Sequence, residues 1–272
     1  MEQQEYRTMY ALESYYWWFV ARRNLVTAIV KAEAHKQNQI EPNTIPKIFD
    51  VGCGTGANLA AFKEYGQVFG IDMSPEAIQF CRQRGLHNLS LSKIEALAYL
   101  PDSFDIITAL DVLEHIDDDN QAMQELYRSC RPGGLLLITV PAYGFLWSEH
   151  DEALHHRRRY AGHELRNKLV LAGFEIERCS YFITLLFFPI LCIRILQGIF
   201  KKSTHPQTSH IKLSNTINSL LIGLLALEQY LFKYINLPFG VSIVCLARKP
   251  LKVITASQNN NIVPFERRSH IA

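Results

Sequence analysis

Three glycines alternate with other residues directly after a short apolar run, within residues 47–57. The run, residues 48–51, carries one acid, Asp50, and the residues after Gly56 have the composition of a helix. A strand, a glycine turn and a helix in this order form the nucleotide-binding unit of an α/β sheet. Glycine permits the tight turn and leaves no Cβ in the path of a ligand, and the helix start presents free N–H groups. The segment therefore predicts a ligand site on an α/β fold.

Two ligands compete for this loop, because its glycine spacing satisfies two fingerprints. The pattern Gly-x-Gly-x-x-Ala from Gly52 fits a dinucleotide, whose pyrophosphate sits at the helix start. The pattern Gly-x-Gly-x-Gly preceded by Asp50 suits S-adenosylmethionine (SAM), which has no phosphate and a cationic amino group. A carboxylate near the site disfavours an anion and favours an ammonium. Asp72, which closes the next strand, can accept from both ribose hydroxyls of either ligand.

Strand-like and helix-like segments alternate from residue 47 onward, as a doubly wound α/β sheet requires. The predicted strands are residues 47–51, 67–72, 89–91, 104–109, 135–140, 174–181 and 241–248. The predicted helices between them are residues 58–65, 75–84, 117–129 and 163–172. Residues 1–46 predict an N-terminal helical cap that ends in a polar linker, residues 37–46, and its aromatic residues 15–19 either pack on the sheet or cover the ligand site. The predicted domains are this cap, the core 47–182, an apolar insertion 183–238, a last strand within 239–250 and a disordered tail 251–272.

The insertion holds two apolar stretches, 183–200 and 217–237. Neither gives the roughly 20 uninterrupted apolar residues of a membrane span, because Arg194 breaks the first and Glu228 and Lys233 break the second. Lysines lie between them at Lys201, Lys202 and Lys212. We expect a helical hairpin lying on a membrane surface. The alternatives are a buried helical pair and a dimer interface.

The net charge and the cysteine pattern limit the cellular compartment and the kinds of partner that the chain can have. The net charge of +2 argues against an extended nucleic-acid surface, and the six cysteines form no CxxC pair. The acidic N-terminus lacks the apolar core of a secretory signal. We expect a reduced, cytoplasmic setting and, given the insertion, association with the inner face of the membrane.

Four blocks give the chain a family resemblance. They are residues 49–56, 70–74, 102–107 and 126–134. In this order and spacing the chain resembles the class I SAM-dependent methyltransferases of the type 11/12 group, which includes ubiquinone-pathway enzymes. A nicotinamide-dependent enzyme is not expected to show the last two blocks together. The resemblance implies SAM as cofactor and a Rossmann-like sheet of seven mostly parallel strands, the last of them antiparallel.

The resemblance also implies roles for individual residues. Asp50 and the glycine loop would face the methionine part of SAM, Asp72 the ribose and Met73 the adenine, while the Leu110 backbone would help to hold the amino group. Relatives often carry an acid near the adenine amino group where this chain has Lys93, so the expected substitute is Glu95 or, alternatively, backbone groups. The implied cofactor-binding residues are Asp50, Gly52, Cys53, Gly54, Gly56, Asp72, Met73, Glu95 and Leu110.

Two further segments carry groups suited to chemistry. Asp111, Glu114 and His115 have helical spacing and resemble the acid-x-x-Glu-His set that binds a divalent metal in some O-methyltransferases, which predicts Mg²⁺ or Mn²⁺. In metal-free relatives the Glu and His orient the loop or act as base, so Glu114 and His115 are also catalytic candidates. Residues 141–160 follow a strand at its carboxyl end and are rich in His, Arg and aromatic residues. There His150 beside Asp151 resembles an oriented base, and the three arginines 157–159 suit phosphate or carboxylate; the alternative is a basic loop on lipid headgroups.

These features predict methyl transfer from SAM, most simply to an oxygen. His115 or His150 would remove the acceptor proton, and the acceptor would be a small or lipid-linked amphiphile at the membrane surface. Two rival functions remain open at this point: a nicotinamide-dependent oxidoreductase, and a non-catalytic SAM-fold protein that docks on a membrane as a partner.

Overall fold

The structure is a computed structural model that describes residues 3–97, 99–199 and 213–251 of the 272-residue chain. Within these residues one sheet has the strand order β3-β2-β1-β4-β5-β7-β6. The strands are β1 (Lys47–Val51), β2 (Gln67–Asp72), β3 (Leu89–Leu91), β4 (Phe104–Leu110), β5 (Cys130–Pro141), β6 (Glu175–Phe182) and β7 (Ser242–Arg248). This is the predicted seven-stranded α/β sheet.

Strand direction follows the prediction as well. The pairs β1–β2, β1–β4, β2–β3 and β4–β5 are parallel, whereas β7 runs antiparallel to both β5 and β6. The strand order reverses between β1 and β4, and ligands of such sheets bind at the carboxyl ends of the strands beside that reversal. The topology therefore directs attention to the loops after β1, β2 and β4.

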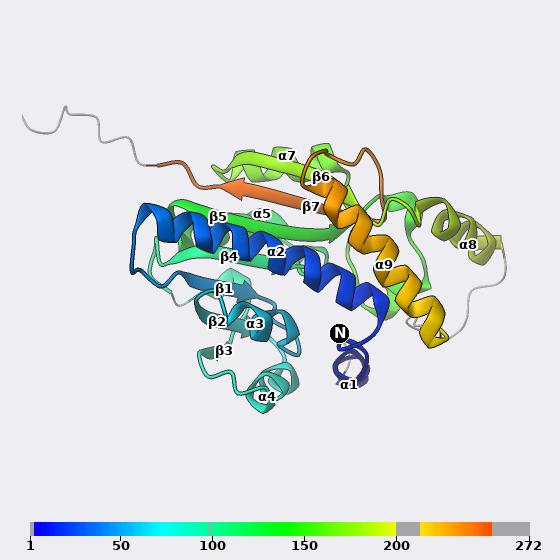
Figure 1. Cartoon of the computed structure of the whole chain (residues 1–272), viewed down its shortest axis with the longest axis horizontal. Helices are drawn as coiled ribbons and strands as arrows, with labels where there is room; N and C mark the ends of the chain where they lie inside the picture. The colour runs from blue at the N-terminus through cyan, green and yellow to red at the C-terminus, as the bar shows by residue number, and fades with distance from the viewer. Residues whose placement is uncertain (1–2, 98, 200–212, 252–272) are drawn as a thin grey trace, which may run out of the picture.

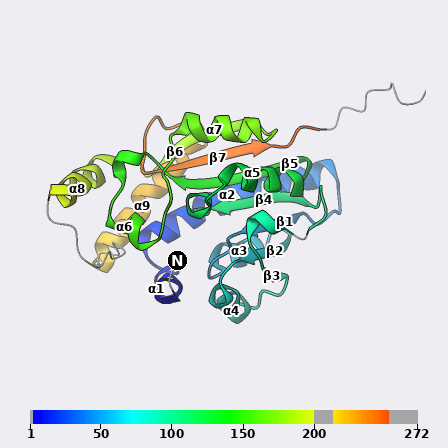
Figure 2. The ribbon, with the colours of Figure 1, turned by 180° about the vertical axis from the view of Figure 1, so that it is seen from behind.

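Helices cover both faces of the sheet, because alternate strand residues point to opposite sides. One face packs against α2 (Trp17–Ile40), α3 (Ala57–Phe62) and α9 (Asn215–Phe232), as Figure 1 shows. The other packs against α5 (Asp119–Ser129) and α7 (Gly162–Leu171), which lie in front in Figure 2. Ile48 belongs to the first core and its neighbour Phe49 to the second, so a single strand serves both.

Two elements extend beyond their predicted bounds. The helix α2 continues to Ile40, where the sequence predicted a linker, because Gln37 is buried and its amide donates to the Asp105 carbonyl. The strand β5 begins at Cys130, where a helix stop was predicted. Gly133 donates its N–H to the Lys249 carbonyl, and Lys249 donates to Gly134, so this glycine pair continues the sheet.

The apolar insertion forms α8 (Phe187–Ile199) and α9, with residues 200–212 between them outside the described part of the chain. The helix α9 is packed on the domain: Asn218 Oδ1 accepts the Trp17 N–H at 2.9 Å, and Leu225 lies in the core. Glu228, which interrupts the apolar pattern, is fully buried and accepts the N–H groups of Thr184 and Leu185. In residues 3–97, 99–199 and 213–251, no helix has the length and apolar character needed to cross a membrane. The predicted membrane-surface role stays a prediction, and the predicted tail lies almost entirely outside the described residues.

Candidate functional site

The loop after β1 adopts a backbone that only glycine accepts easily. Gly52 and Gly54 have φ values of 67° and 53°, in the left-handed region. A Cβ on Gly52 would lie 2.4 Å from Cγ2 of Val112, in the loop after β4. Gly52 therefore allows the loops after β1 and β4 to approach each other, and Gly56, also left-handed, begins α3.

Asp72 ties this loop to the end of β2. Its Oδ2 accepts the Gly54 N–H at 2.9 Å, and its Oδ1 accepts the Ser74 N–H at 2.9 Å. Burial raises the pKa of Asp72, and these backbone N–H groups oppose the rise by favouring the charged form. The predicted ribose-binding carboxylate thus lies directly against the glycine loop.

Asp50 lies beneath the loop, and a buried cation compensates its charge. Its carboxylate is 2% exposed and accepts from Thr108 Oγ1 at 2.6 Å. Burial raises the pKa of Asp50 to about 7, against the opposing effects of Thr108 and Arg22. The Arg22 guanidinium, from α2, pairs with Asp111 and lies 4.5 Å from the Trp18 ring centroid. Burial lowers the pKa of Arg22 to about 10, so it remains a cation among these acids.

The other predicted cofactor residues lie along the same edge of the sheet. Leu110 ends β4 and is buried, and Met73 follows Asp72 with 66% of its surface exposed. Cys53 is buried, with its Sγ 3.7 Å from the Sγ of Cys81. Glu95 is half-buried on the short helix η1 (Ile94–Ala96), which follows β3. The structure thus places all the predicted cofactor residues at or just after the carboxyl ends of β1 to β4.

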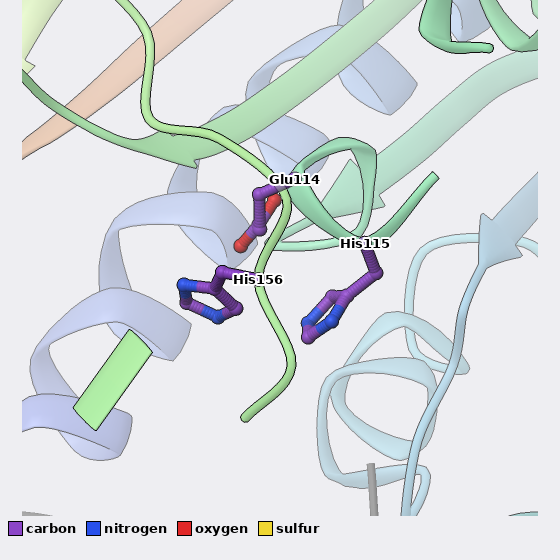
Figure 3. Close-up of side chains that lie close together, drawn as sticks. All are labelled: Glu114, His115 and His156. Atoms are coloured by element: carbon purple, nitrogen blue, oxygen red, sulfur yellow. The ribbon is translucent and has the colours of Figure 1, made fainter. Parts of the chain in front are cut away.

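A second polar cluster lies beside this loop. Glu114 and His115 come from the single turn η2 (Leu113–His115) after β4, and His156 comes from the loop after β5 (Figure 3). Ligand atoms of these three residues lie within 4.8 Å of one another. Glu114 is fully buried, and neither carboxyl oxygen has a hydrogen-bond partner in the described part of the chain. Burial raises the pKa of Glu114 to about 8 and lowers the pKa of His115 to about 3.

His156 is oriented by a buried acid. Its Nδ1 lies 2.9 Å from Asp151 Oδ1, on the short helix α6 (Glu149–Ala153), and the same oxygen accepts from Arg159 Nε at 2.8 Å. Although burial opposes it, His156 and Arg159 hold the pKa of Asp151 well below its usual range. Since Nδ1 is engaged, Nε2 is the nitrogen that remains for the cluster.

The predicted chemical groups therefore come together only in part. Asp111 pairs with Arg22 and accepts from Thr139 Oγ1 at 3.1 Å, so His156 stands where the sequence placed Asp111 as the third donor. The Asp151 partner predicted for His150 contacts His156 instead, and the two histidine rings lie 6.5 Å apart. The sequence shows that residues 150–156 are rich in histidine. It does not show which histidine contacts Asp151, because the contact with His156 reaches past the end of the five-residue helix α6 and follows no helical spacing.

The three arginines of this loop mainly hold the loop itself. Arg159 is buried with Asp151 and donates to the Ala142 carbonyl. Arg158 pairs with Asp119 at 3.1 Å and donates to two carbonyls after η2. Arg157 is more exposed and pairs with Asp117 at 3.2 Å. The predicted anion-binding role is therefore left mainly to Arg157.

Comparison with known proteins bears on the glycine loop and its strands. Residues 49–138 match the family model described as "Methyltransferase domain". This segment is a methyltransferase domain, similar to those of the class I SAM-dependent methyltransferases. The methyltransferase domain includes β1, β4 and the glycine loop, and the family implies SAM as the ligand of that loop.

Individual relatives match only part of their own length. A ubiquinone biosynthesis O-methyltransferase of Idiomarina loihiensis is 33% identical over 101 residues, which cover 35% of this chain and 42% of that protein. A malonyl-acyl-carrier-protein O-methyltransferase of Serratia marcescens is 35% identical over 118 residues, which cover 40% of this chain and 46% of that protein. The chain thus spans less than half the length of these curated relatives.

Solved structures support the fold over more of the chain. A SAM-dependent methyltransferase of Thermotoga maritima superposes with a TM-score of 0.54 at 17% identity, covering 90% of this chain and 95% of that one. The cyclase SpnF superposes with a TM-score of 0.53 at 20% identity, covering 83% and 80%. The methyltransferase fold therefore extends to the sheet as a whole.

Proposed function

We propose that the protein transfers a methyl group from SAM to an oxygen of an amphiphilic acceptor. The observation that carries the proposal is the carboxylate of Asp72 against the Gly54 N–H, at the carboxyl end of β2. The left-handed glycines, which leave the loop without side chains, and the acid Asp50 beneath it fit a cationic nucleoside better than a diphosphate. When bound, SAM supplies a methyl group already activated by its sulfonium.

Because the donor is activated, the protein contributes mainly alignment and proton removal. We assign proton removal to the cluster of Glu114, His115 and His156, which adjoins the methyltransferase domain at the end of β4. The His156 ring, held by Asp151, is a pre-oriented acceptor for a hydroxyl proton, and the unpartnered carboxyl group of Glu114 lies beside it. Arg22 keeps this acidic region electrically balanced.

The rival functions have less support. A nicotinamide-dependent oxidoreductase would have to place a diphosphate next to the buried acid Asp50. A non-catalytic partner protein would have no use for a buried, unpartnered Glu114 facing two histidines. A cyclase shares this fold, so the decisive test must follow the methyl group itself.

We keep a divalent cation as a second proposal for the same cluster. The predicted set of Asp111, Glu114 and His115 becomes Glu114, His115 and His156. The unpartnered oxygens of Glu114 fit a cation, and a histidine whose other nitrogen contacts a carboxylate is a common metal ligand. One carboxylate and two imidazoles suit Mn²⁺ better than Mg²⁺. A cation there would act as a Lewis acid on the acceptor oxygen.

The exposed apolar surface of α8 and α9 supports an amphiphilic acceptor and an anionic lipid surface as the place of action. Phe188 is 62% exposed, Ile195 55% and Leu220 67%. From residue 183 to 241 the one acid is Glu228, which is buried, whereas the basic residues are Arg194, Lys201, Lys202, Lys212 and Lys233. Phe187, the first residue of α8, packs against Tyr143 with ring centroids 6.0 Å apart, which places α8 beside the loop that carries His156. An apolar surface next to the site, on a segment whose sequence is rich in basic residues, fits a lipid-anchored acceptor.

A vesicle experiment checks this surface. The protein should sediment with phosphatidylglycerol vesicles more than with phosphatidylcholine vesicles, and salt should reduce the difference. Phe188→Asp should weaken the binding at least about tenfold, because it places a carboxylate on the apolar face. Leu171→Asp, on an even more exposed leucine of α7, is the control and should bind as the wild type does. Equal binding by all three proteins would contradict the lipid surface.

Methyl transfer itself is tested with SAM labelled in its methyl group. Incubation with a native lipid extract should move label into one extractable, membrane-soluble compound, identified by its mass gain of one methylene. Label found only in water-soluble acceptors would contradict the amphiphilic acceptor. A bound SAM that is never consumed would contradict methyl transfer.

A further inference from the structure

The N-terminal helix α1 (Gln3–Leu12) lies across the ligand side of the glycine loop, apart from the sheet in both views (Figures 1 and 2). The Tyr6 hydroxyl donates to Asp72 Oδ1 at 3.3 Å. The Met9 methyl lies 3.0 Å from the position that a Cβ on Gly54 would take. Residues of α1 therefore occupy space that the glycines leave open for a ligand.

Contacts separate from Tyr6 hold α1 in this place. The Tyr10 ring stacks on Phe80 of α4 (Pro75–Gln83), with centroids 4.4 Å apart, and the Arg84 guanidinium lies 4.5 Å from the Tyr10 ring centroid. Just after α1, Glu13 accepts from Thr55 Oγ1 at 2.7 Å and pairs with Arg84. Thr55 belongs to the glycine loop, so α1 is docked on the loop and on α4 together. Its position does not depend on the Tyr6 hydrogen bond alone.

The Tyr6 hydrogen bond competes for the acceptor capacity of Asp72. A carboxylate offers about four lone-pair sites. Asp72 already accepts from Gly54, Ser74 and Tyr6, and it interacts with the Met73 N–H as well. The two hydroxyls of a ribose need two of these sites. The Tyr6 hydroxyl is 66 residues away in sequence and is the one side-chain donor among these groups, so it is the donor that can leave when α1 moves.

We propose that Tyr6 is a latch: α1 closes the cofactor site while Tyr6 donates to Asp72, and Tyr6 leaves Asp72 when the ribose of SAM binds. This inference rests on the proposed function, because it takes SAM as the ligand of the loop. Coupling of this kind is reciprocal, so the contact that holds α1 closed lowers the affinity for the cofactor by the same factor. The latch makes cofactor entry depend on the position of α1.

Calorimetry with S-adenosylhomocysteine (SAH) tests the competition on the full-length protein. Tyr6→Phe removes the hydroxyl, keeps the ring and should tighten SAH binding about three- to tenfold, the range of an ordinary single hydrogen bond, because this one is long at 3.3 Å. Tyr10→Phe removes a hydroxyl from the same helix and should leave the affinity unchanged. Weaker SAH binding by Tyr6→Phe, or an affinity equal to that of the wild type, would overturn the latch.

Amide hydrogen exchange tests the movement. On saturation with SAH, exchange should become faster in residues 3–12 and slower in residues 67–74. Slower exchange in both segments would show that α1 closes over the ligand instead, which would overturn the latch while leaving the proposed function intact. Absence of any SAH binding by the wild type and by Tyr6→Phe would overturn the proposed function and the latch with it.

Discussion

Replacing Asp72 by asparagine should weaken the binding of SAH at least about 100-fold. Both carboxylate oxygens accept backbone N–H groups, from Gly54 and from Ser74, so an amide would turn its own NH₂ toward one of these donors. The loop would lose its anchor and the ribose its acceptor. Hydrogen bonds to a charged group contribute about 1.5–3 kcal/mol each, and each 1.4 kcal/mol is about tenfold in affinity. Two lost bonds therefore account for the expected effect.

The measurement is isothermal calorimetry with SAH, together with a thermal unfolding curve for each variant. Glu64→Gln neutralises an exposed acid just after α3 and should bind as the wild type does. Asp72→Asn that unfolds like the wild type and keeps its SAH affinity would remove the basis of the cofactor site. A change in unfolding temperature without a change in affinity would reduce Asp72 to a structural residue.

The order of elements was predictable because short-range signals specify it. The strands at residues 47–51, 67–72 and 89–91 have the predicted bounds, and the first two end at a glycine or an acid. Asp50 and Asp72 were predictable for the same reason, since each has a fixed place relative to a strand end. The extension of α2 to Ile40 was not, because it depends on the contact of Gln37 with Asp105, far away in sequence.

The chemical cluster was predictable only in part, and local geometry explains why. The expected convergence of Asp111, Glu114 and His115 assumed an α-helical turn. The observed turn is a 3-10 helix limited to residues 113–115, and Asp111 before it has a φ of 55°, so its carboxylate reaches Arg22 instead. Arg22 and His156 enter from α2 and from the loop after β5, and nothing in their own sequence neighbourhood marks Arg22 as the partner of Asp111 or His156 as a neighbour of Glu114. Tertiary packing alone supplies them.

Replacing His156 by alanine should lower the rate of methyl transfer about 100- to 10,000-fold, the usual effect of losing a general base. The affinity for SAH should stay within about threefold of the wild type, because His156 lies in the Glu114 cluster and not in the loop of Gly54 and Asp72. The rate is measured with labelled SAM and the acceptor found in the lipid extract. Asp151→Asn should give a smaller loss, because it weakens the contacts with His156 and Arg159 but keeps the His156 imidazole.

The sequence and the structure favour different histidines, so His150→Ala is the informative control. It should retain most of the rate, since Asp151 contacts His156. The opposite result, a large loss of rate for His150→Ala and none for His156→Ala, would identify His150 as the base. It would also show that the cluster of Glu114, His115 and His156 takes no part in proton removal.

A titration with Mn²⁺ distinguishes the two proposals for the cluster, a general base and a divalent-cation site. A cation needs the histidine nitrogens as ligands, whereas a base needs one of them free to take up a proton. If a cation belongs there, the wild type should bind Mn²⁺ and both Glu114→Gln and His156→Ala should lose that binding, since each removes one of the three donors. A chelator should then lower the rate of the wild type as far as these substitutions do. If the wild type takes up no Mn²⁺ and a chelator leaves its rate unchanged, the cation proposal fails. The carboxyl group of Glu114 would then remain as a buried group whose missing hydrogen-bond partner is the hydroxyl of the bound substrate.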